Sequence, residues 1–416
     1  MSHTRPQLLF SIAATLLVAG CAGNTLIETP SVYETTETPL FVDLAPALQG
    51  DTVEVLYVTD RLPQKVQSGV PAYGSGRSMS SALGVAQVAI EPDNGKPDSA
   101  RKIELMAVDE LVRFPETPYL YRVADGGRIE IEPSAIRERE SAWLAAREEI
   151  GERLALTPKK DVYLDVHGVA TEFDKAILDL ATFWHFLGRE GVPIAYTWPA
   201  GSEGLLFYTA DRESGEFTIL HLKEFLRLLA EIPEVERVHV TAHSRGTDVV
   251  ITALRELIIE ARAGGLDPRT HFKLENLVLM AADIDLEVDM QRIEGEAMAP
   301  AFGRATIYTN TEDKALAVAA GLFSSQQRVG SVDLSELTDR QREFVHRTSN
   351  LNVIVYDGKG GGVFRHGYYD DPAVSSDMLM LLRYGWGPGE GERQGLQQLD
   401  ENTWRIDATY WNTASQ

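Results

Sequence analysis

The sequence predicts one large α/β domain with a mostly parallel central sheet and helices on both faces. From about Asp161 onward, short apolar runs rich in β-branched residues alternate with segments whose apolar residues recur at helical spacing. This alternation is typical of βαβ units, in which a helix connects two parallel strands. A chain of 416 residues with 44% hydrophobic residues can build a core of this size. The predicted strands are Val162–Val166, Ile194–Thr197, Val238–Thr241, Leu277–Met280, Ala305–Tyr308 and Val353–Tyr356.

Helices are predicted between these strands, and two further strands before them. Apolar residues at helical spacing run through residues 173–187, 222–229 and 249–258. The strand-like runs Val53–Val58 and Ala86–Ile90 are expected to form the antiparallel start of the sheet. Residues 102–156 end in a charged helix, and we expect them to be an insertion in the N-terminal half of the domain.

The first 50 residues are expected to lie outside the domain, which would span residues 51–416. Residues 1–20 combine Arg5, an apolar run and a small-residue ending, the pattern of a secretory signal. The apolar run Leu8–Val18 is too short to span a bilayer. Residues 21–50 are rich in Thr, Glu and Pro and show no apolar period, which predicts a flexible tether.

The end of the signal resembles a bacterial lipobox. In Val18-Ala19-Gly20-Cys21, the resemblance implies that Cys21 becomes the lipidated first residue of the mature chain. Ala22 follows, where an Asp would suggest retention in the inner membrane. We therefore expect a lipid-anchored protein of the bacterial cell envelope, on the periplasmic face and in the outer membrane rather than the inner one. The alternative is an ordinary cleaved signal with an incidental Cys.

Composition excludes several classes of partner and cofactor. The formal net charge of −23 argues against nucleic-acid binding, because that affinity rests on Lys and Arg at phosphates. A single Cys excludes an internal disulfide and any multi-Cys metal site. Acidic residues from Asp283 to Glu294 fall at calcium-loop positions, but Val288 stands where that loop needs glycine. We expect no metal and no cofactor.

A nucleophile is predicted after the third of the predicted strands. Val238–Thr241 leads into Ala242-His243-Ser244-Arg245-Gly246, and a helical pattern starts at once. A Ser between small residues on a sharp strand-to-helix turn is typical of a nucleophile elbow. The turn needs small residues two before and two after the Ser, and Ala242 stands here in place of the more usual Gly. The alternative is that Ser244 is an ordinary helix N-cap.

A serine nucleophile needs a base, and the base needs an acid to orient it. In this arrangement the acid and then the base follow the Ser along the chain, each after a later strand. Asp313 follows Ala305–Tyr308 and is the predicted acid, while His366 follows the last strand and a glycine-rich loop and is the predicted base. The rivals of these two residues are Asp283, Asp285 and Glu312 for the acid and His346 for the base.

The oxyanion hole of such a site requires two backbone N–H groups. One is expected from Arg245, the residue after the nucleophile. The strand Val162–Val166 ends in His167-Gly168-Val169, where Gly168 allows close approach of the backbone and Val169 is expected to supply the second N–H.

Several stretches together resemble a bacterial α/β-hydrolase family of formerly unknown function, often described as esterase/lipase superfamily enzymes. The resemblance covers about residues 51–382 and implies an α/β-hydrolase fold with Ser244, Asp313 and His366 as its triad. It departs at Arg245, where a smaller or apolar residue is common, and at the insertion. The stretches are Leu56-Tyr57-Val58-Thr59-Asp60-Arg61, Tyr73-Gly74, His167-Gly168, Tyr196-Thr197-Trp198-Pro199, Tyr208 with Asp211-Arg212, Ala242-His243-Ser244-Arg245-Gly246, Asp313-Lys314-Ala315-Leu316, and His366 with Tyr368-Tyr369.

The function expected from these patterns is a membrane-anchored serine hydrolase that cleaves carboxylic esters through an acyl-enzyme. Its substrate would be a small-molecule or lipid ester, of unspecified acyl length. Two alternatives stay open: a non-catalytic envelope lipoprotein that uses the fold as a binding module, and an acyltransferase.

Overall fold

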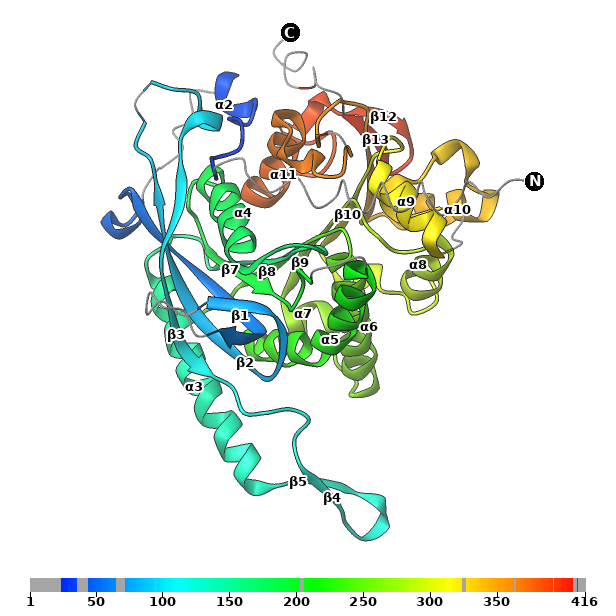
Figure 1. Ribbon diagram of the computed structural model, residues 1–416. Coiled ribbons are helices and arrows are strands. Elements are labelled where there is room, and N and C mark those ends of the chain that lie inside the picture. Colours follow the sequence, from blue (N-terminus) through cyan, green and yellow to red (C-terminus); the bar gives the residue numbers. More distant parts are fainter. Residues whose placement is uncertain are drawn as a thin grey trace, which may run out of the picture.

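A single large sheet runs through the part of the chain that the computed structural model describes (Figure 1). The described residues are 24–35, 44–64, 72–93, 95–202, 206–323, 327–362, 364–391, 393–406 and 410. The strands of the sheet are β1 (Thr52–Gln64), β2 (Ala72–Ile90), β3 (Ile103–Arg113), β6 (Asp161–Val166), β7 (Val192–Thr197), β8 (Arg237–His243), β9 (Leu274–Met280), β10 (Arg304–Thr309), β11 (Leu351–Tyr356), β12 (Gln397–Asp400) and β13 (Thr403–Ile406).

The strand order is β12-β13-β11-β10-β9-β8-β6-β7-β1-β2-β3. In this order, every neighbouring pair between β13 and β1 is parallel. Only the pairs at the two edges, β1–β2, β2–β3 and β12–β13, are antiparallel. The six predicted strands lie within β6 to β11, and the predicted antiparallel start is the pair β1–β2. Because the central strands are parallel, the segments that follow β6, β8, β9, β10 and β11 meet at one edge of the sheet.

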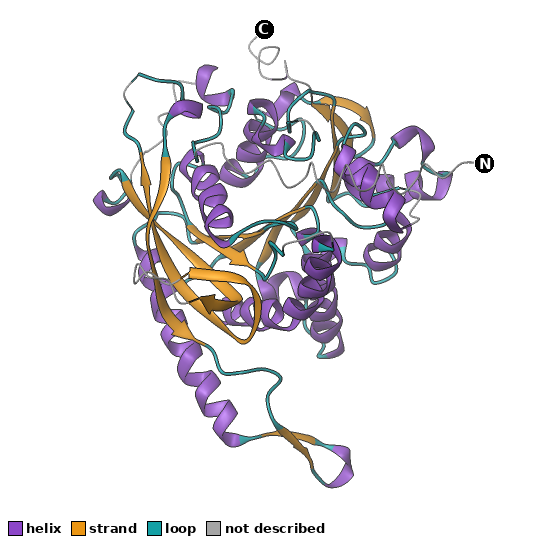
Figure 2. Cartoon of the chain, in the orientation of Figure 1, coloured by secondary structure: helices purple, strands orange, loops and turns teal. Residues whose placement is uncertain are grey.

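Helices cover both faces of the sheet (Figure 2). Helices α3, α5, α6 and α8 contribute to one buried apolar cluster, and α4 and α11 contribute to another. The predicted helical segments lie in α4, α5 and α6, where the apolar residues at helical spacing are the buried ones. The longer helices are α3 (Pro133–Ala155), α4 (Phe173–Phe186), α5 (Phe207–Glu231), α6 (Gly246–Ala263), α8 (Leu286–Ile293), α9 (Lys314–Phe323), α10 (Asp339–Arg347) and α11 (Pro372–Tyr384), and the shorter ones are α2 (Val32–Thr35) and α7 (Pro268–Phe272).

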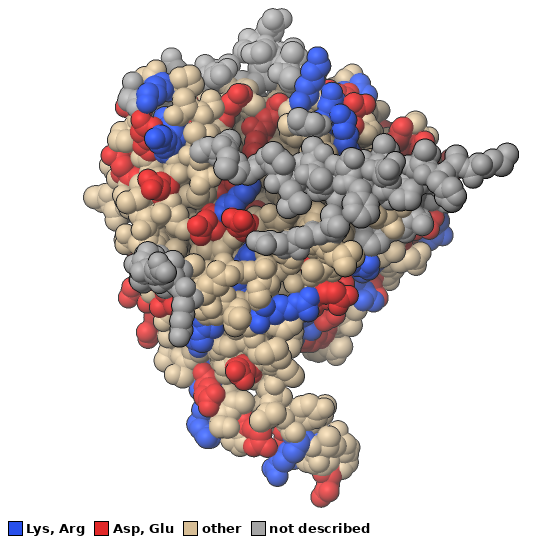
Figure 3. Space-filling view, in the orientation of Figure 1, with Lys and Arg blue, Asp and Glu red and all other residues tan. Residues whose placement is uncertain are grey.

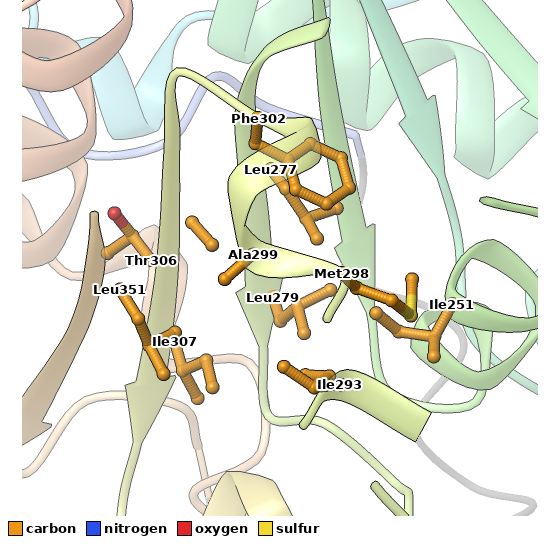
Figure 4. A pocket seen from close by; sticks show the side chains of 11 residues that line it. Ile251, Leu277, Leu279, Ile293, Met298, Ala299, Phe302, Thr306, Ile307 and Leu351 are labelled. Atoms are coloured by element: carbon orange, nitrogen blue, oxygen red, sulfur yellow. The ribbon is translucent and has the colours of Figure 1, made fainter. Parts of the chain in front are cut away.

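Figure 4 shows a small apolar pocket inside the first of these clusters. Side chains from α6, β9, α8, β10 and β11 converge on it, among them Ile251, Leu279, Ile293 and Ile307. Its lining is apolar except for Thr306 and carries no titratable side chain, so we interpret the pocket as a gap in core packing.

The predicted insertion at residues 102–156 is narrower than expected. Its first part is β3, which pairs with β2 along the sheet, and its last part is α3, whose Trp143, Ala146, Ile150 and Leu154 are buried. The segment between them leaves the body of the molecule as a hairpin of β4 (Tyr121–Val123) and β5 (Ile129–Ile131), and the first turns of α3 project with it (Figure 1). Because α3 contains many charged residues, its narrow apolar face could not be recognised from the sequence.

The N-terminal segment differs from the flexible tether predicted for residues 21–50. Leu26 and Val32 are each 2% exposed, and Leu26 donates its backbone N–H to Arg101 O at 3.0 Å. The Ser31 N–H bonds to Pro372 O at 3.3 Å, at the start of α11. A few isolated apolar residues therefore fix this segment on the domain, although its composition is that of a linker. Residues 1–23, with the predicted signal and Cys21, lie outside the described residues.

Asp289 in α8 gives the fold a pH-dependent stability that a substitution can remove. Its side chain is buried, and burial raises the pKa of Asp289 to about 7 against the opposing effect of Arg292. An unfolded Asp titrates near 3.9, so between about pH 4 and 7 the native chain keeps a proton that the unfolded chain has released. The free energy of unfolding therefore falls as pH rises through that window, by roughly 4 kcal/mol for this group.

We expect Asp289→Asn to raise the free energy of unfolding at pH 8 by about 2–4 kcal/mol and to change it little near pH 4, because Asn cannot ionise. Urea unfolding at the two pH values measures this difference. The substitution Glu287→Gln, at an exposed position of the same helix, is the control. An Asp289→Asn effect of equal size at both pH values would contradict the account.

Candidate active site

Ser244 lies on the predicted sharp turn, between the end of β8 and the start of α6. Its φ is 51°, a left-handed conformation that costs a non-glycine residue about 1–3 kcal/mol and is typical of functional sites. The Ser244 N–H donates to Met280 O at 2.9 Å, and the Ser244 carbonyl accepts from the Asp283 N–H at 3.2 Å. The strained residue is thus held by the end of the neighbouring strand β9.

Small residues around Ser244 are required by direct contact. A Cβ on Gly246 would lie 2.3 Å from His167 O, and a Cβ on Gly168 would lie 2.7 Å from Ser244 Cβ. Ala242, two residues before the Ser, is fully buried. The loop after β6 therefore lies against the Ser244 turn. This is the loop in which the sequence predicts one N–H donor of an oxyanion hole.

The predicted acid and base are hydrogen-bonded to each other. Asp313, after β10, and His366, after β11, meet with Oδ2 and Nδ1 2.7 Å apart. The Asp313 side chain is fully buried, and the His366 side chain is 21% exposed. The Lys314 N–H donates to Phe364 O at 2.9 Å and ties the two loops together. With Nδ1 engaged by the carboxylate, Nε2 of His366 is the nitrogen left for proton transfer.

Ser244 and His366 are linked through His243, the residue before the Ser. The His243 and His366 rings lie 4.7 Å apart, centroid to centroid. Among the described residues, the Ser244 hydroxyl makes no hydrogen bond to His366. Catalytic hydrogen bonds in enzymes without substrate are often long and tighten in the complex.

Three of the four rivals of the acid and base have other partners. Asp285 caps α8, accepting the Val288 N–H at 3.1 Å. Glu312 is exposed and pairs with Arg365 at 3.1 Å. His346 lies in α10 and pairs with Asp400 at 3.0 Å.

Asp283, the fourth rival, lies near the site but is engaged elsewhere. Its carboxylate accepts a hydrogen bond from the Tyr208 hydroxyl and lies 3.5 Å from Nε of Arg328. Burial raises the pKa of Asp283, while Arg328, Tyr208 and others oppose the shift. Within the described part of the chain Asp283 does not bond to His366, so the geometry favours Asp313 as its partner.

The two amides expected to form the oxyanion hole are available. In the described part of the chain, neither Val169 N–H nor Arg245 N–H donates to another protein group. The amide after Val169 is held, because Asp211 Oδ2 accepts the Ala170 N–H at 2.8 Å. The same carboxylate group of Asp211 accepts the N–H groups of residues 201 and 202 at 3.1 and 3.0 Å. Asp211, from α5, therefore fixes the loop that carries Val169.

Arg61 also stabilises the loop that carries Val169. It is 2% exposed and donates to Thr171 O at 2.8 Å and to Ala200 O at 2.7 Å. Arg61 also lies 3.3 Å from Nε2 of His167, and burial lowers the pKa of His167 to about 3. His167 is therefore neutral and accepts from Arg61. Burial also lowers the pKa of Arg61 to about 10, so the guanidinium stays charged at neutral pH.

Asp211 and Arg61 belong to the sequence motifs that resemble the family, but the sequence does not predict a role for either residue. Their partners lie 9 to 41 residues away for Asp211 and 13 to 139 residues away for Arg61. Contacts between residues so far apart leave no local pattern in the sequence. The one signal for Arg61 was the polar Thr-Asp-Arg run that directly follows an apolar stretch.

The Arg245 side chain, unusual at its position, turns away into an ion-pair network. Its guanidinium lies 2.5 Å from Asp248 and donates to Asp283 O at 3.3 Å. Asp248 also pairs with Arg292 of α8. The guanidinium thus ties α6 to the segment after β9, and among the described residues the backbone N–H of Arg245 has no acceptor.

One family matches more than half of this chain. It is described as "Alpha/beta hydrolase of unknown function (DUF900)", and the match spans residues 143–383. This range contains Ser244, Asp313, His366 and both amides of the expected oxyanion hole. The comparison with curated proteins gives no match.

Two solved structures are similar to the chain in part or in whole. A crystal structure of ESTFA in its Fe-lacking apo form is 14% identical, with a TM-score of 0.20; 41% of this chain and 63% of that chain are covered, which is less than two thirds of that protein. A glucuronoyl esterase from Solibacter usitatus is 11% identical, with a TM-score of 0.18, covering 100% of this chain and 91% of that one. At these scores neither likeness bears on the site.

Proposed function

The chain belongs to the family of α/β hydrolases of unknown function that matches residues 143–383, and from this membership we propose that it is a serine hydrolase of carboxylic esters. The predicted α/β-hydrolase fold and the predicted family are confirmed by this match. The nucleophile, the ester substrate and the membrane anchor are the parts proposed here.

In the proposed reaction Ser244 Oγ attacks the ester carbonyl carbon while Nε2 of His366 takes the hydroxyl proton. Asp313 holds the imidazole through Nδ1 and stabilises the imidazolium. The N–H groups of Val169 and Arg245 bind the oxyanion. His366 then protonates the leaving alcohol as the carbon–oxygen bond breaks, which leaves an acyl-Ser244. Water, deprotonated by His366, attacks the acyl-enzyme and releases the carboxylic acid.

One observation carries the proposal. The Asp313–His366 hydrogen bond of 2.7 Å joins loops after two successive strands, at the sheet edge where the strained Ser244 turn also lies. An Asp, a His and a Ser in a left-handed turn have no structural reason to converge there. A serine hydrolase requires that convergence.

Hydrolysis of p-nitrophenyl acetate, butyrate, octanoate and palmitate by the purified full chain tests the activity. We expect turnover of at least one ester, and the profile along the series reports the preferred acyl length. A folded chain that turns over none of these esters, and takes no label from a fluorophosphonate, would contradict the proposal.

We further propose that lipidated Cys21 holds the enzyme on the periplasmic face of the outer membrane. Charge offers no substitute, because the net charge is −23 and acidic and basic side chains are interspersed on the face shown in Figure 3. No helix within the described residues is long and apolar enough to cross a membrane. Asn24 O accepts the Ile103 N–H at 3.0 Å, so only two residues separate Cys21 from the domain.

We expect Cys21→Ser to move the protein from the membrane fraction to the soluble fraction of the envelope, because the substitution removes the acylated thiol. Fractionation of cells that express each full chain measures this, with esterase activity as the check on folding. A Cys21→Ser chain that stays with the membrane would contradict the anchor and leave the hydrolase proposal standing.

A further inference from the structure

His243 lies between the nucleophile turn and the loop that carries His366. Its ring is 4.7 Å from the His366 ring and 4.7 Å from the Tyr369 ring, centroid to centroid. Its Nε2 lies 3.3 Å from the backbone carbonyl oxygen of His366. Its Nδ1 would lie 3.3 Å from a Cβ on Gly168, so the ring also lies next to the loop that carries Gly168 and Val169.

The contact with His366 O fixes the tautomer of His243. A carbonyl oxygen only accepts hydrogen bonds, so Nε2 must carry the proton and donate it. The bond ends on the main chain of the very residue whose side chain is the proposed base. His243 therefore restrains the His366 backbone while Asp313 restrains the His366 ring.

The loop that carries His366 needs such a restraint. It contains Gly358, Gly360, Gly361 and Gly362, and Gly361 and Gly362 have φ of 89° and 66°. A glycine-rich backbone loses more conformational entropy than any other when it is fixed, so few intrinsic preferences hold it in place.

His243 also has to stay uncharged next to the base. Burial lowers the pKa of His243 well below its usual value, and the positive charges of a protonated His366 and of Lys175 lower it further. The two groups face it from the loop after β11 and from α4, and the neutral His167 lies in the loop after β6. The His243 ring thus stays neutral while His366 takes up the proton from Ser244.

We propose that His243 is a positioning residue, which holds the His366 loop through the Nε2–H···O bond and so sets the base against Ser244. The proposal rests on the proposed hydrolase function.

The test compares His243→Phe and His243→Asn, which cannot make the bond, with His243→Gln, whose amide can donate to the same carbonyl. The first readout is the Nδ1–H proton of His366, observed by NMR on the full chain and assigned with His366→Asn. We expect a slowly exchanging signal in the natural chain and in His243→Gln, and a broadened or lost signal in His243→Phe and His243→Asn. Thermal unfolding identifies any variant that fails to fold.

The second readout is kinetic. We expect kcat to fall 10- to 100-fold in His243→Phe and His243→Asn with KM nearly unchanged, and to recover in His243→Gln, because the change displaces the base and not the substrate. His346→Gln, remote from the site, is the control. An unaltered His366 signal in folded His243→Phe and His243→Asn would overturn the proposal, and this holds even if the natural chain proves inactive on esters.

Discussion

A Ser244→Ala chain should lose at least about 10⁴-fold of the ester hydrolysis rate, because the acyl-enzyme pathway has no other nucleophile. The substitution removes one oxygen and keeps the Cβ that lies against Gly168. The φ of 51° is as costly for Ala as for Ser, so the midpoint of thermal unfolding should stay within about 2 °C. The measurement is kcat/KM on the best ester of the series.

Ser335→Ala, on the exposed 3-10 turn before α10, is the matched control and should keep full activity. Retention of more than a few per cent of the rate by a folded Ser244→Ala chain would mean that another group performs the attack.

Asp313→Asn should lower kcat by about 10³–10⁴-fold while KM changes little. An Asn amide is close in shape to the carboxylate, but it can offer its N–H to His366 Nδ1. The imidazole would then carry its proton on Nε2, which faces Ser244, and it could no longer act as a base. The missing negative charge would also fail to stabilise the imidazolium.

Asp283→Asn is the comparison that the chain itself provides. Asp283 is as deeply buried as Asp313, but its carboxylate accepts from Tyr208 and not from His366. We expect its rate to fall no more than about tenfold, through displaced neighbours of Ser244. Equal losses in the two variants, or a larger loss in Asp283→Asn, would contradict the assignment of Asp313 as the acid.

Much of the fold could be predicted from the sequence because each central element carries a local signal. The strands β6 to β11 are short apolar runs, and α4, α5 and α6 show apolar residues at helical spacing. The sharp turn at Ser244 could also be predicted, because a Ser flanked by small residues between a strand and a helix is typical of a nucleophile elbow. The positions of Asp313 and His366 followed from strand order, and the structure brings the two side chains into contact.

The remaining features depend on contacts between distant residues. Leu26 and Val32 are single apolar residues in a polar segment, and only the surface of α11 and its neighbours explains why they are buried. The hydrogen bonds of Arg61 and Asp211 to the loop that carries Val169 join segments from four parts of the chain. A sequence pattern indicates periodicity and turn-forming residues, but it does not indicate which buried charged side chains contact which distant groups.

The most direct test of the central claim is to locate a covalent adduct. The full chain is treated with a fluorophosphonate, digested, and mapped by mass spectrometry, with Ser244→Ala treated in parallel. The account predicts one phosphonyl group on the peptide that contains Ser244 in the natural chain and none in the variant. A folded natural chain that carries no adduct, or an adduct at another residue that persists in Ser244→Ala, would contradict it.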